Sequence, residues 1–415
     1  MEKSIRENIE HPEKLEELYL SNKTEFKNSF NIVYPKLIDH KLAEFWNIRL
    51  NTNRKAKDNS YKINIPLLLI LSFITGTLAK LPYILDIDIE PYFAKNIGYI
   101  IFPVLIIFFI IKNKLSLKKS TFIIGVLILS WVLISQIIMV NKSSDTYILT
   151  GIHLPLFLWS LLGFTFIAKD YKSFTNRINF LRFNGEILIL TILILILGGI
   201  LTGLTIGLFS LTGMDITEFY MKWIVVYGIT AAPVVSTFIV QSNPQLVDKV
   251  SSMLAKIFSP LVLVTLLIYL ASSAMSNKDP FTDREYLIIF NLILISVMAI
   301  IFFAVSENSK SDISKPNSIT LFLLSVVTII VNSIALSAII FRISEWGFTP
   351  NRLVVLGSNI LILVNLTMVS YNLLFSTFKS KSNLKVVKSI AKFLPIYSLW
   401  TIIVVFVLPY IFNFK

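Results

Sequence analysis

Long apolar segments recur from residue 63 to the end of the chain, and short polar breaks separate them. An α-helix needs about 20 apolar residues to cross a hydrocarbon core, and each segment is near that length. The sequence therefore predicts an all-α fold, a polytopic transmembrane bundle of about eleven helices within a range of ten to twelve. The expected spans are residues 63–84, 91–111, 121–140, 148–168, 187–211, 223–240, 257–275, 287–304, 319–341, 353–375 and 393–412.

Composition agrees with a membrane location. Hydrophobic residues make up 55% of the chain and charged residues only 15%, whereas about 25% of the residues of a soluble domain are charged. The mean hydropathy is +0.73. The chain contains no cysteine, which excludes a disulfide framework, a thiolate metal site and a cysteine nucleophile. Its three histidines, His11, His40 and His153, do not stand at metal-ligand spacing, so we expect no metal and no cofactor.

The first 62 residues differ from the rest, because they are rich in charge and contain no long apolar segment. The chain therefore divides into a helical N-terminal module, residues 1–62, and a transmembrane domain, residues 63–415. Helical spacing of apolar side chains predicts helices over residues 12–20, 23–34 and 35–50 of the module. Two interpretations of the module stay open: a docking or regulatory domain that contacts a cytoplasmic protein, or a solvated cap on the membrane domain.

The distribution of Lys and Arg predicts the orientation. With the N-terminus inside, the inner breaks and the stretch before the first span hold 22 of these residues, against 9 on the opposite side. This asymmetry follows the positive-inside rule, so we expect a cytoplasmic N-terminus and an external C-terminus. It explains the net charge of +13 without a nucleic-acid partner. Basic segments next to the membrane attract anionic lipids, which makes membrane lipids the expected partners.

Charged residues are almost absent from the expected spans. Lys80 and Lys95 stand near span ends, where their ammonium groups can reach the interface. His153 is expected to be a hydrogen-bonded interfacial residue. No paired carboxylate, histidine cluster, or nucleophile with its base occupies one membrane face, so we expect no catalytic residues. The scarcity of buried charge also weakens the case for an ion-coupled transporter.

Glycines in the fifth span show the sharpest spacing. Gly199, Gly203 and Gly207 repeat every four residues and therefore share one helix face. Small residues at this spacing let a neighbouring helix approach closely, so the pattern predicts a helix-packing face.

The ninth and tenth spans are the most polar. Ser325 and Asn332 recur at a seven-residue step, as do Ser358, Asn365 and Asn372, which predicts an intramembrane polar stripe. Amides in lipid need partners, so the stripe is interpreted as interhelical hydrogen bonding, with a polar path as the alternative.

The break between these spans contains a candidate anion or lipid-headgroup site. Thr349 suits the cap and Pro350 the first turn of the tenth span. Asn351 and Arg352 then stand at the amino end of that helix, where backbone donors favour an anion. The alternative is an interfacial anchor in which Arg342 pairs with Glu345 and Trp346 rests in the aromatic belt.

Three short stretches carry a resemblance to a known family. They are the run from His11 to Tyr19, Trp46 with Arg49 and Leu50, and the Gly347–Arg352 loop before a long apolar helix. Together they resemble a family of bacterial multi-pass membrane proteins known only as a domain of unknown function. The resemblance implies a multi-pass protein of the bacterial cytoplasmic (inner) membrane. It implies no reaction, cofactor or catalytic residue.

Three functional classes remain open. The favoured hypothesis is a non-enzymatic membrane protein in envelope maintenance or signalling, whose residues 1–62 contact a cytoplasmic partner. The first alternative is a transporter or lipid flippase. The second is a membrane enzyme that acts on a lipid-linked substrate, which the absence of a recognisable catalytic set disfavours.

Overall fold

The computed structural model is helical, and no strand occurs among the residues that it describes. These residues are 1–37, 39–51, 64–140, 144–168, 170–211, 214–275, 281, 284–307, 315–378 and 384–414. Most of the basic stretch expected before the first span, from Arg54 to Lys62, lies outside them. The chain separates into two compact units, Met1–Tyr61 and Lys62–Lys415.

The described part of the first unit consists of four short helices and one 3-10 turn. They are α1 (Glu2–Glu7), α2 (Pro12–Ser21), α3 (Lys23–Val33), η1 (Tyr34–Lys36) and α4 (Lys41–Asn51). The third expected helix thus begins at Lys41 instead of residue 35, because the chain first turns at η1. At the start of α3, the side chain of Asn22 accepts the N–H of Glu25 at 3.1 Å and caps the helix.

Aromatic side chains form the core of this unit. Phe26 and Phe30 stack within α3, and Trp46 of α4 packs on Phe26 with ring centroids 5.0 Å apart. All three are buried. Arg49 closes the edge of the core, because it pairs with Glu16 at 2.8 Å while its guanidinium lies over the Trp46 ring. The unit therefore has a hydrophobic core of its own.

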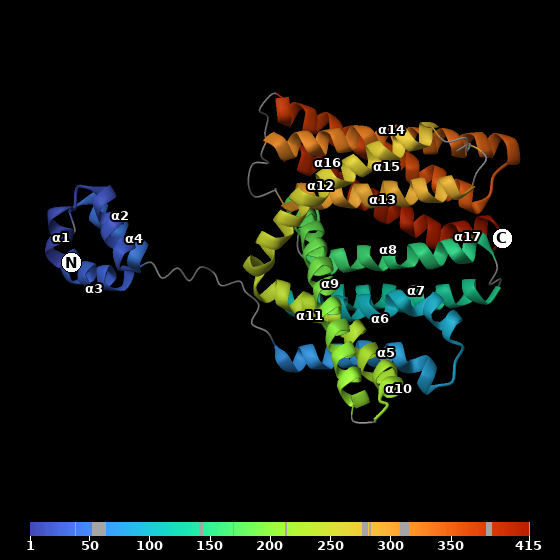
Figure 1. Ribbon diagram of the computed structural model, residues 1–415, viewed down its shortest axis with the longest axis horizontal. Coiled ribbons are helices and arrows are strands. Elements are labelled where there is room, and N and C mark those ends of the chain that lie inside the picture. The colour runs from blue at the N-terminus through green and yellow to red at the C-terminus, as the bar shows by residue number, and fades with distance from the viewer. Residues whose placement is uncertain are drawn as a thin grey trace. The chain divides into compact units, whose positions relative to one another are not determined.

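The second unit is a bundle of long apolar helices (Figure 1). Its elements are α5 (Ile65–Ile84), α6 (Ile89–Lys112), α7 (Leu117–Val140), α8 (Asp145–Ile167), α9 (Phe174–Leu211), α10 (Thr217–Phe219), η2 (Tyr220–Val225), α11 (Val226–Ser242), α12 (Pro244–Met275), α13 (Arg284–Glu307), α14 (Lys315–Trp346), α15 (Pro350–Phe378), α16 (Leu384–Ile402), η4 (Ile403–Val407) and α17 (Leu408–Ile411). The expected all-α polytopic fold is confirmed.

Ten helical segments of the described chain are long and apolar enough to cross a membrane. The remaining expected span, residues 257–275, belongs to α12, whose described apolar part is the shorter segment Ala255–Ala271. The protein is therefore a multi-pass membrane protein, and its ten spans lie within the range that the sequence predicts.

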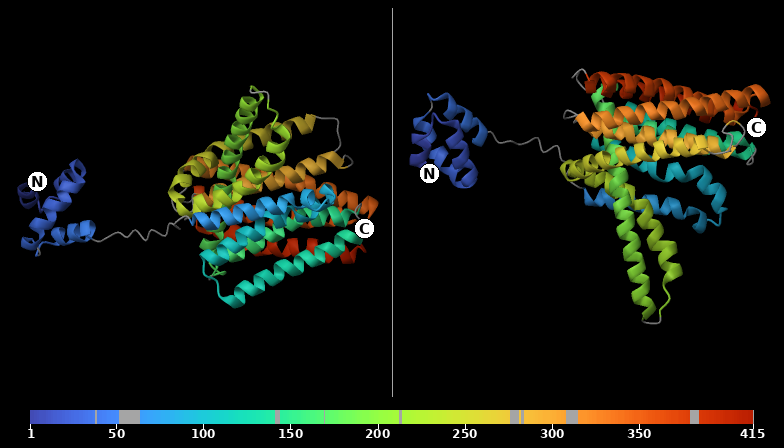
Figure 2. Two further views of the ribbon diagram at one scale, coloured as in Figure 1. Left: turned by 90° about the horizontal axis from the view of Figure 1, so that it is seen from below. Right: turned by 45° about the horizontal axis from the view of Figure 1, so that its top comes forward.

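The membrane helices form two groups. One group contains α5, α6, α7, α8 and α11, and the other contains α12 to α16. Helix α9 contacts α11 and α8 of the first group and α12, α13 and α16 of the second. It crosses most of the other helices steeply, and its second half projects from the bundle beside α10, η2 and the start of α11 (Figure 2). Helix α9 therefore contacts both groups, which also touch each other directly where α8 packs on α15, α16 and η4.

The start of α9 differs from the sequence expectation. The helix is 38 residues long and begins at Phe174 instead of residue 187. The hydroxyl of Ser173 accepts the N–H of Asn176 at 3.3 Å, as an N-cap does. Arg182 and Glu186, expected in a loop, pair with each other inside the helix. By hydropathy alone, the polar residues before position 187 are expected outside the span. The helix can include them because the charges of Arg182 and Glu186 pair.

Side chains at one end of the bundle tie its helices together. Asn113 donates to the carbonyl of Thr165 at 2.7 Å, and Lys119 donates to that of Ala168 at 3.2 Å. Arg177 of α9 donates to the carbonyl of Ala391 in α16 at 3.1 Å. We call this the basic end, defined by Asn113, Lys119 and Arg177.

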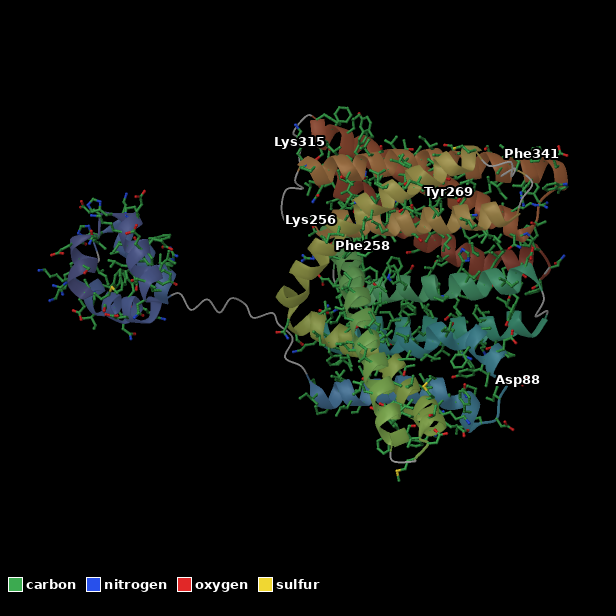
Figure 3. The ribbon with its side chains drawn as sticks, viewed as in Figure 1. Asp88, Lys256, Phe258, Tyr269, Lys315 and Phe341 are labelled. Carbon is green, nitrogen blue, oxygen red and sulfur yellow. The ribbon has the colours of Figure 1, made fainter. Side chains whose placement is uncertain are left out.

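Four labelled side chains show which other segments lie at each end of the bundle. Lys256 and Lys315 lie toward one end, and Asp88 and Phe341 lie toward the other (Figure 3). Lys315 begins α14 and Asp88 precedes α6, so these two helices start at opposite ends of the bundle.

Candidate functional site

A cavity lies among α8, α9, α13, α15 and α16. It is partly open, has a volume of about 490 Å³ and is lined chiefly by Leu, Ile, Met and Phe side chains. None of its described lining residues is Asp, Glu, Lys or Arg. Ligand pockets in proteins measure about 300–1,000 Å³ and are mostly apolar. This cavity therefore has the size and lining of a site for an uncharged, largely apolar ligand.

Helices α9 and α13 supply one wall of the cavity. On α9, Leu181, Gly185 and Leu188 recur at helical spacing and share the face that lines it. Gly185 is needed there, because a Cβ at this position would overlap the ring of Phe303 on α13. The glycine therefore lets the phenyl ring pack directly against the α9 backbone beside the cavity.

Two tryptophans of the lining donate hydrogen bonds between helices. Trp159 of α8 donates its indole N–H to the side-chain oxygen of Asn184 in α9 at 2.9 Å. Trp400 of α16 donates to the hydroxyl of Ser358 in α15, also at 2.9 Å. Both bonds place polar atoms in an otherwise apolar wall. These are the few oriented polar groups that give a pocket its selectivity.

Tyr397 links three helices at the cavity. Its hydroxyl accepts a hydrogen bond from Asn365 of α15 at 2.9 Å and donates to the sulfur of Met298 on α13 at 3.5 Å. His153, also in the lining, bonds through Nδ1 to the carbonyl of Leu149 at 2.9 Å on its own helix. The imidazole thus behaves as the hydrogen-bonded side chain that we expected.

The predicted polar stripe divides between bonds within and across helices. Asn332 of α14 donates to the carbonyl of Asn359 in α15 at 3.1 Å, whereas Ser325 and Asn372 donate to carbonyls of their own helices. Ser358 and Asn365 bond to α16, so Asn332, Ser358 and Asn365 take part in interhelical hydrogen bonds, whereas the described bonds of Ser325 and Asn372 do not cross between helices. The stripe joins α14, α15 and α16, and its Ser358 also lines the cavity.

The structure shows how the Thr349–Arg352 loop is held. The hydroxyl of Thr349 accepts the N–H of Arg352 at 3.3 Å and caps α15. Arg352 donates through Nη1 to the carbonyls of Trp346 and Gly347, each at 2.7 Å. Gly347 has a φ of +73°, which suits glycine at the end of α14. Asn351 stands beside Arg352 in the first turn, so both remain at the amino end of α15.

In the alternative interpretation, the interfacial anchor, Arg342 is expected to pair with Glu345, and this contact differs in the structure. Arg342 is buried and donates through Nε to the carbonyl of Phe281 at 2.9 Å. Its expected partner, Glu345, is exposed, and the described contacts include no ion pair between the two. Arg342 therefore joins α14 to the segment before α13, a connection that local spacing does not reveal.

The glycine face of α9 makes no close contact within the described chain. Gly199, Gly203 and Gly207 are exposed, and a Cβ at any of them would meet no described atom within 4 Å. No described helix therefore packs closely against this face. The sequence pattern predicts which helix face carries small residues, but it does not predict which other elements that face contacts.

The structure contains a buried charge cluster that the sequence pattern did not predict. Arg182 of α9 lies 3.0 Å from Glu186 on the same helix and 3.4 Å from Glu307 at the end of α13. All three side chains are at least nine-tenths buried. The spacing of Arg182 and Glu186, four residues apart, is typical of a helical ion pair. Glu307 is 125 residues further along the chain, so only the packing of α13 on α9 reveals its role.

Comparison of the chain with protein-family models, curated proteins and solved structures finds no match. Among the described residues, no group of three or more His, Asp and Glu side chains is arranged to hold a metal ion. The candidate functional site is therefore the cavity, whose described lining is uncharged.

Proposed function

We propose that this protein binds the apolar part of a membrane lipid in the cavity and belongs to the transporter or lipid-flippase class. The observation that carries the proposal is the cavity of about 490 Å³ whose described lining contains no charged side chain. An apolar chain can enter it without desolvating an ion, whereas an ionic solute would lose its hydration without receiving a countercharge.

The polar groups of the wall would select the lipid. A lipid chain that moves from the bilayer into the cavity exchanges one apolar environment for another, so burial alone contributes little affinity. Selectivity then depends on shape and on the hydrogen-bonding groups of Asn184, Ser358 and Tyr397. These groups suit a hydroxyl, ester or amide near one end of the apolar chain.

The position of α9 supports a role in movement of the lipid. This helix contributes one cavity wall and also contacts both helix groups. A shift of α9 would change the cavity and the relative position of the groups together, as rigid-body mechanisms require. We place the protein in the bacterial cytoplasmic membrane with the basic end inside, on the charge asymmetry and the family resemblance.

A cavity-filling variant tests the proposal. Ala299 lines the cavity and is exposed within it, so Ala299→Trp fills the space without displacing a core side chain. Leu292→Trp is the matched control, because Leu292 lies two turns earlier on α13, is 65% exposed and does not line the cavity. Each variant would be reconstituted with a phospholipid that carries a photoreactive group in its acyl chain.

We expect crosslinks to α13 and α9 in the native protein and the control, and at least a tenfold reduction in Ala299→Trp. Equal crosslinking in all three proteins would refute binding in the cavity. Fluorescent-lipid translocation in proteoliposomes then separates a flippase, which moves lipid between leaflets, from a protein that only binds it.

A second candidate function is docking of a cytoplasmic protein by the first unit. The unit has its own core, yet it exposes the large apolar side chains Leu20, Ile32, Phe45 and Ile48. A photocrosslinking residue at position 45 of the full chain should capture the same soluble protein as one at position 48. A photocrosslinking residue at the exposed Lys3 is the control. Absence of a shared adduct at 45 and 48 would leave the solvated-cap interpretation.

A further inference from the structure

Lys80 is a buried cation inside a membrane span. It belongs to α5, one turn before the end of the helix, and only 2% of the residue is exposed. The sequence led us to expect that its ammonium group reaches the interface. In the structure, its Nζ lies 4.4 Å from the ring centroid of Trp223 in η2 and 4.5 Å from that of Tyr83.

Contacts between α5 and α11 hold these rings in place. The ring of Tyr227 occupies the space that a Cβ at Gly76 would need. The Tyr227 hydroxyl lies 3.2 Å from the Thr77 hydroxyl. Trp223 is one helical turn before Tyr227 and is thereby brought over Lys80. The enclosure therefore comes from two helices that are distant in sequence and firmly packed together.

No carboxylate among the described residues forms an ion pair with Lys80. The two acids that precede η2 have other partners, since Glu218 pairs with Lys222 and Asp215 accepts the backbone N–H of Thr217 at 3.0 Å. That hydrogen bond holds the pKa of Asp215 below its ordinary value. The charge of Lys222 acts on Lys80 with the same sign. Aromatic rings attract a cation but do not neutralise it.

We propose that Lys80, between Tyr83 and Trp223, binds the phosphate group of an anionic ligand at the opposite end of the bundle. An ionisable residue inside a membrane marks a functional site when its partner is missing, and an oxyanion supplies the absent countercharge. Tyr and Trp are enriched at the level of lipid headgroups, which places this enclosure at the depth of a phospholipid phosphate. A free phosphate ion has the same chemistry. The site is independent of the cavity.

Thermal unfolding and native mass spectrometry of the purified full chain test the site. Lys80→Met keeps the length of the side chain and removes its charge, and Lys80→Gln serves if that variant does not fold. Lys95→Met is the matched control, since Lys95 also stands over a ring, that of Trp131, at 4.1 Å but is partly exposed. The probes are phosphatidylglycerol, uncharged diacylglycerol and inorganic phosphate.

We expect phosphatidylglycerol to raise the melting temperature of the native protein and of Lys95→Met, and to bind Lys80→Met about tenfold more weakly. Diacylglycerol should produce no such shift. A Lys80-dependent shift with inorganic phosphate alone would assign the site to free phosphate. Equal binding of phosphatidylglycerol to Lys80→Met and the native protein, or an equal shift with diacylglycerol, would overturn the proposal.

Discussion

Arg182 and Lys222 each pair with a glutamate four residues away on the same helix, but the two pairs differ in their surroundings. The Lys222–Glu218 pair is exposed, with side-chain exposures of 53% and 79%. The Arg182–Glu186 pair is buried and also contacts Glu307. Water and salt screen the first pair, so it contributes little to stability, whereas the second must balance charges that have left water.

We therefore predict that Arg182→Met destabilises the protein strongly. The substitution keeps an apolar stem but leaves the buried carboxylates of Glu186 and Glu307 without this guanidinium. Loss of one partner from a buried ion pair typically costs about 3–5 kcal/mol. Thermal unfolding in detergent should show a large decrease in melting temperature, while Glu218→Gln, the exposed control, should leave it nearly unchanged. Similar melting temperatures for the two variants would show that the buried cluster is not a stabilising contact.

At the scale of elements, α9 has two halves with different environments. Its first half carries the buried ion cluster and one wall of the cavity. Its second half is exposed, and no residue of its most apolar window is buried. The glycines of this second half face open space, whereas Gly185 of the first half packs against Phe303. A glycine of this protein therefore permits close helix packing only where a side chain of another helix lies against it.

Two glycine substitutions should separate these environments. A Cβ at Gly357 of α15 would overlap the indole ring of Trp400, so Gly357→Leu should force α15 and α16 apart. Overpacking of this kind typically costs about 1–3 kcal/mol. Gly203→Leu meets no described neighbour and should melt like the native protein. A decrease for Gly203→Leu as large as that for Gly357→Leu would show that the second half of α9 is covered by other atoms in solution.

At the scale of the whole molecule, the charges of the connecting segments determine how the bundle inserts. The basic end carries Asn113, Lys119 and Arg177 with their carbonyl partners, and Lys256 and Lys315 also lie toward it. Because retention of Lys and Arg on the cytoplasmic side sets orientation, this charge distribution supports the proposal that the basic end faces the cytoplasm.

Labelling of single cysteines tests the orientation, and the native chain contains no cysteine to interfere. Phe348 between α14 and α15 is 68% exposed, and Ser116 between α6 and α7 is also exposed. A membrane-impermeant maleimide should label Phe348→Cys in intact cells with a permeabilised outer membrane, and Ser116→Cys only after lysis. The reverse labelling pattern would invert the proposed topology.

The sequence by itself determined the all-α membrane class and most span positions, because a hydrocarbon core imposes a length and an apolarity that one helix must meet alone. It also indicated the cap at Thr349, which depends on neighbouring residues. Only the tertiary structure decided that α9 includes Arg182 and reaches Glu307, that Trp223 covers Lys80, and that five helices line a cavity. These features join residues far apart in the chain, and a pattern in one segment does not specify which surface another segment brings to it.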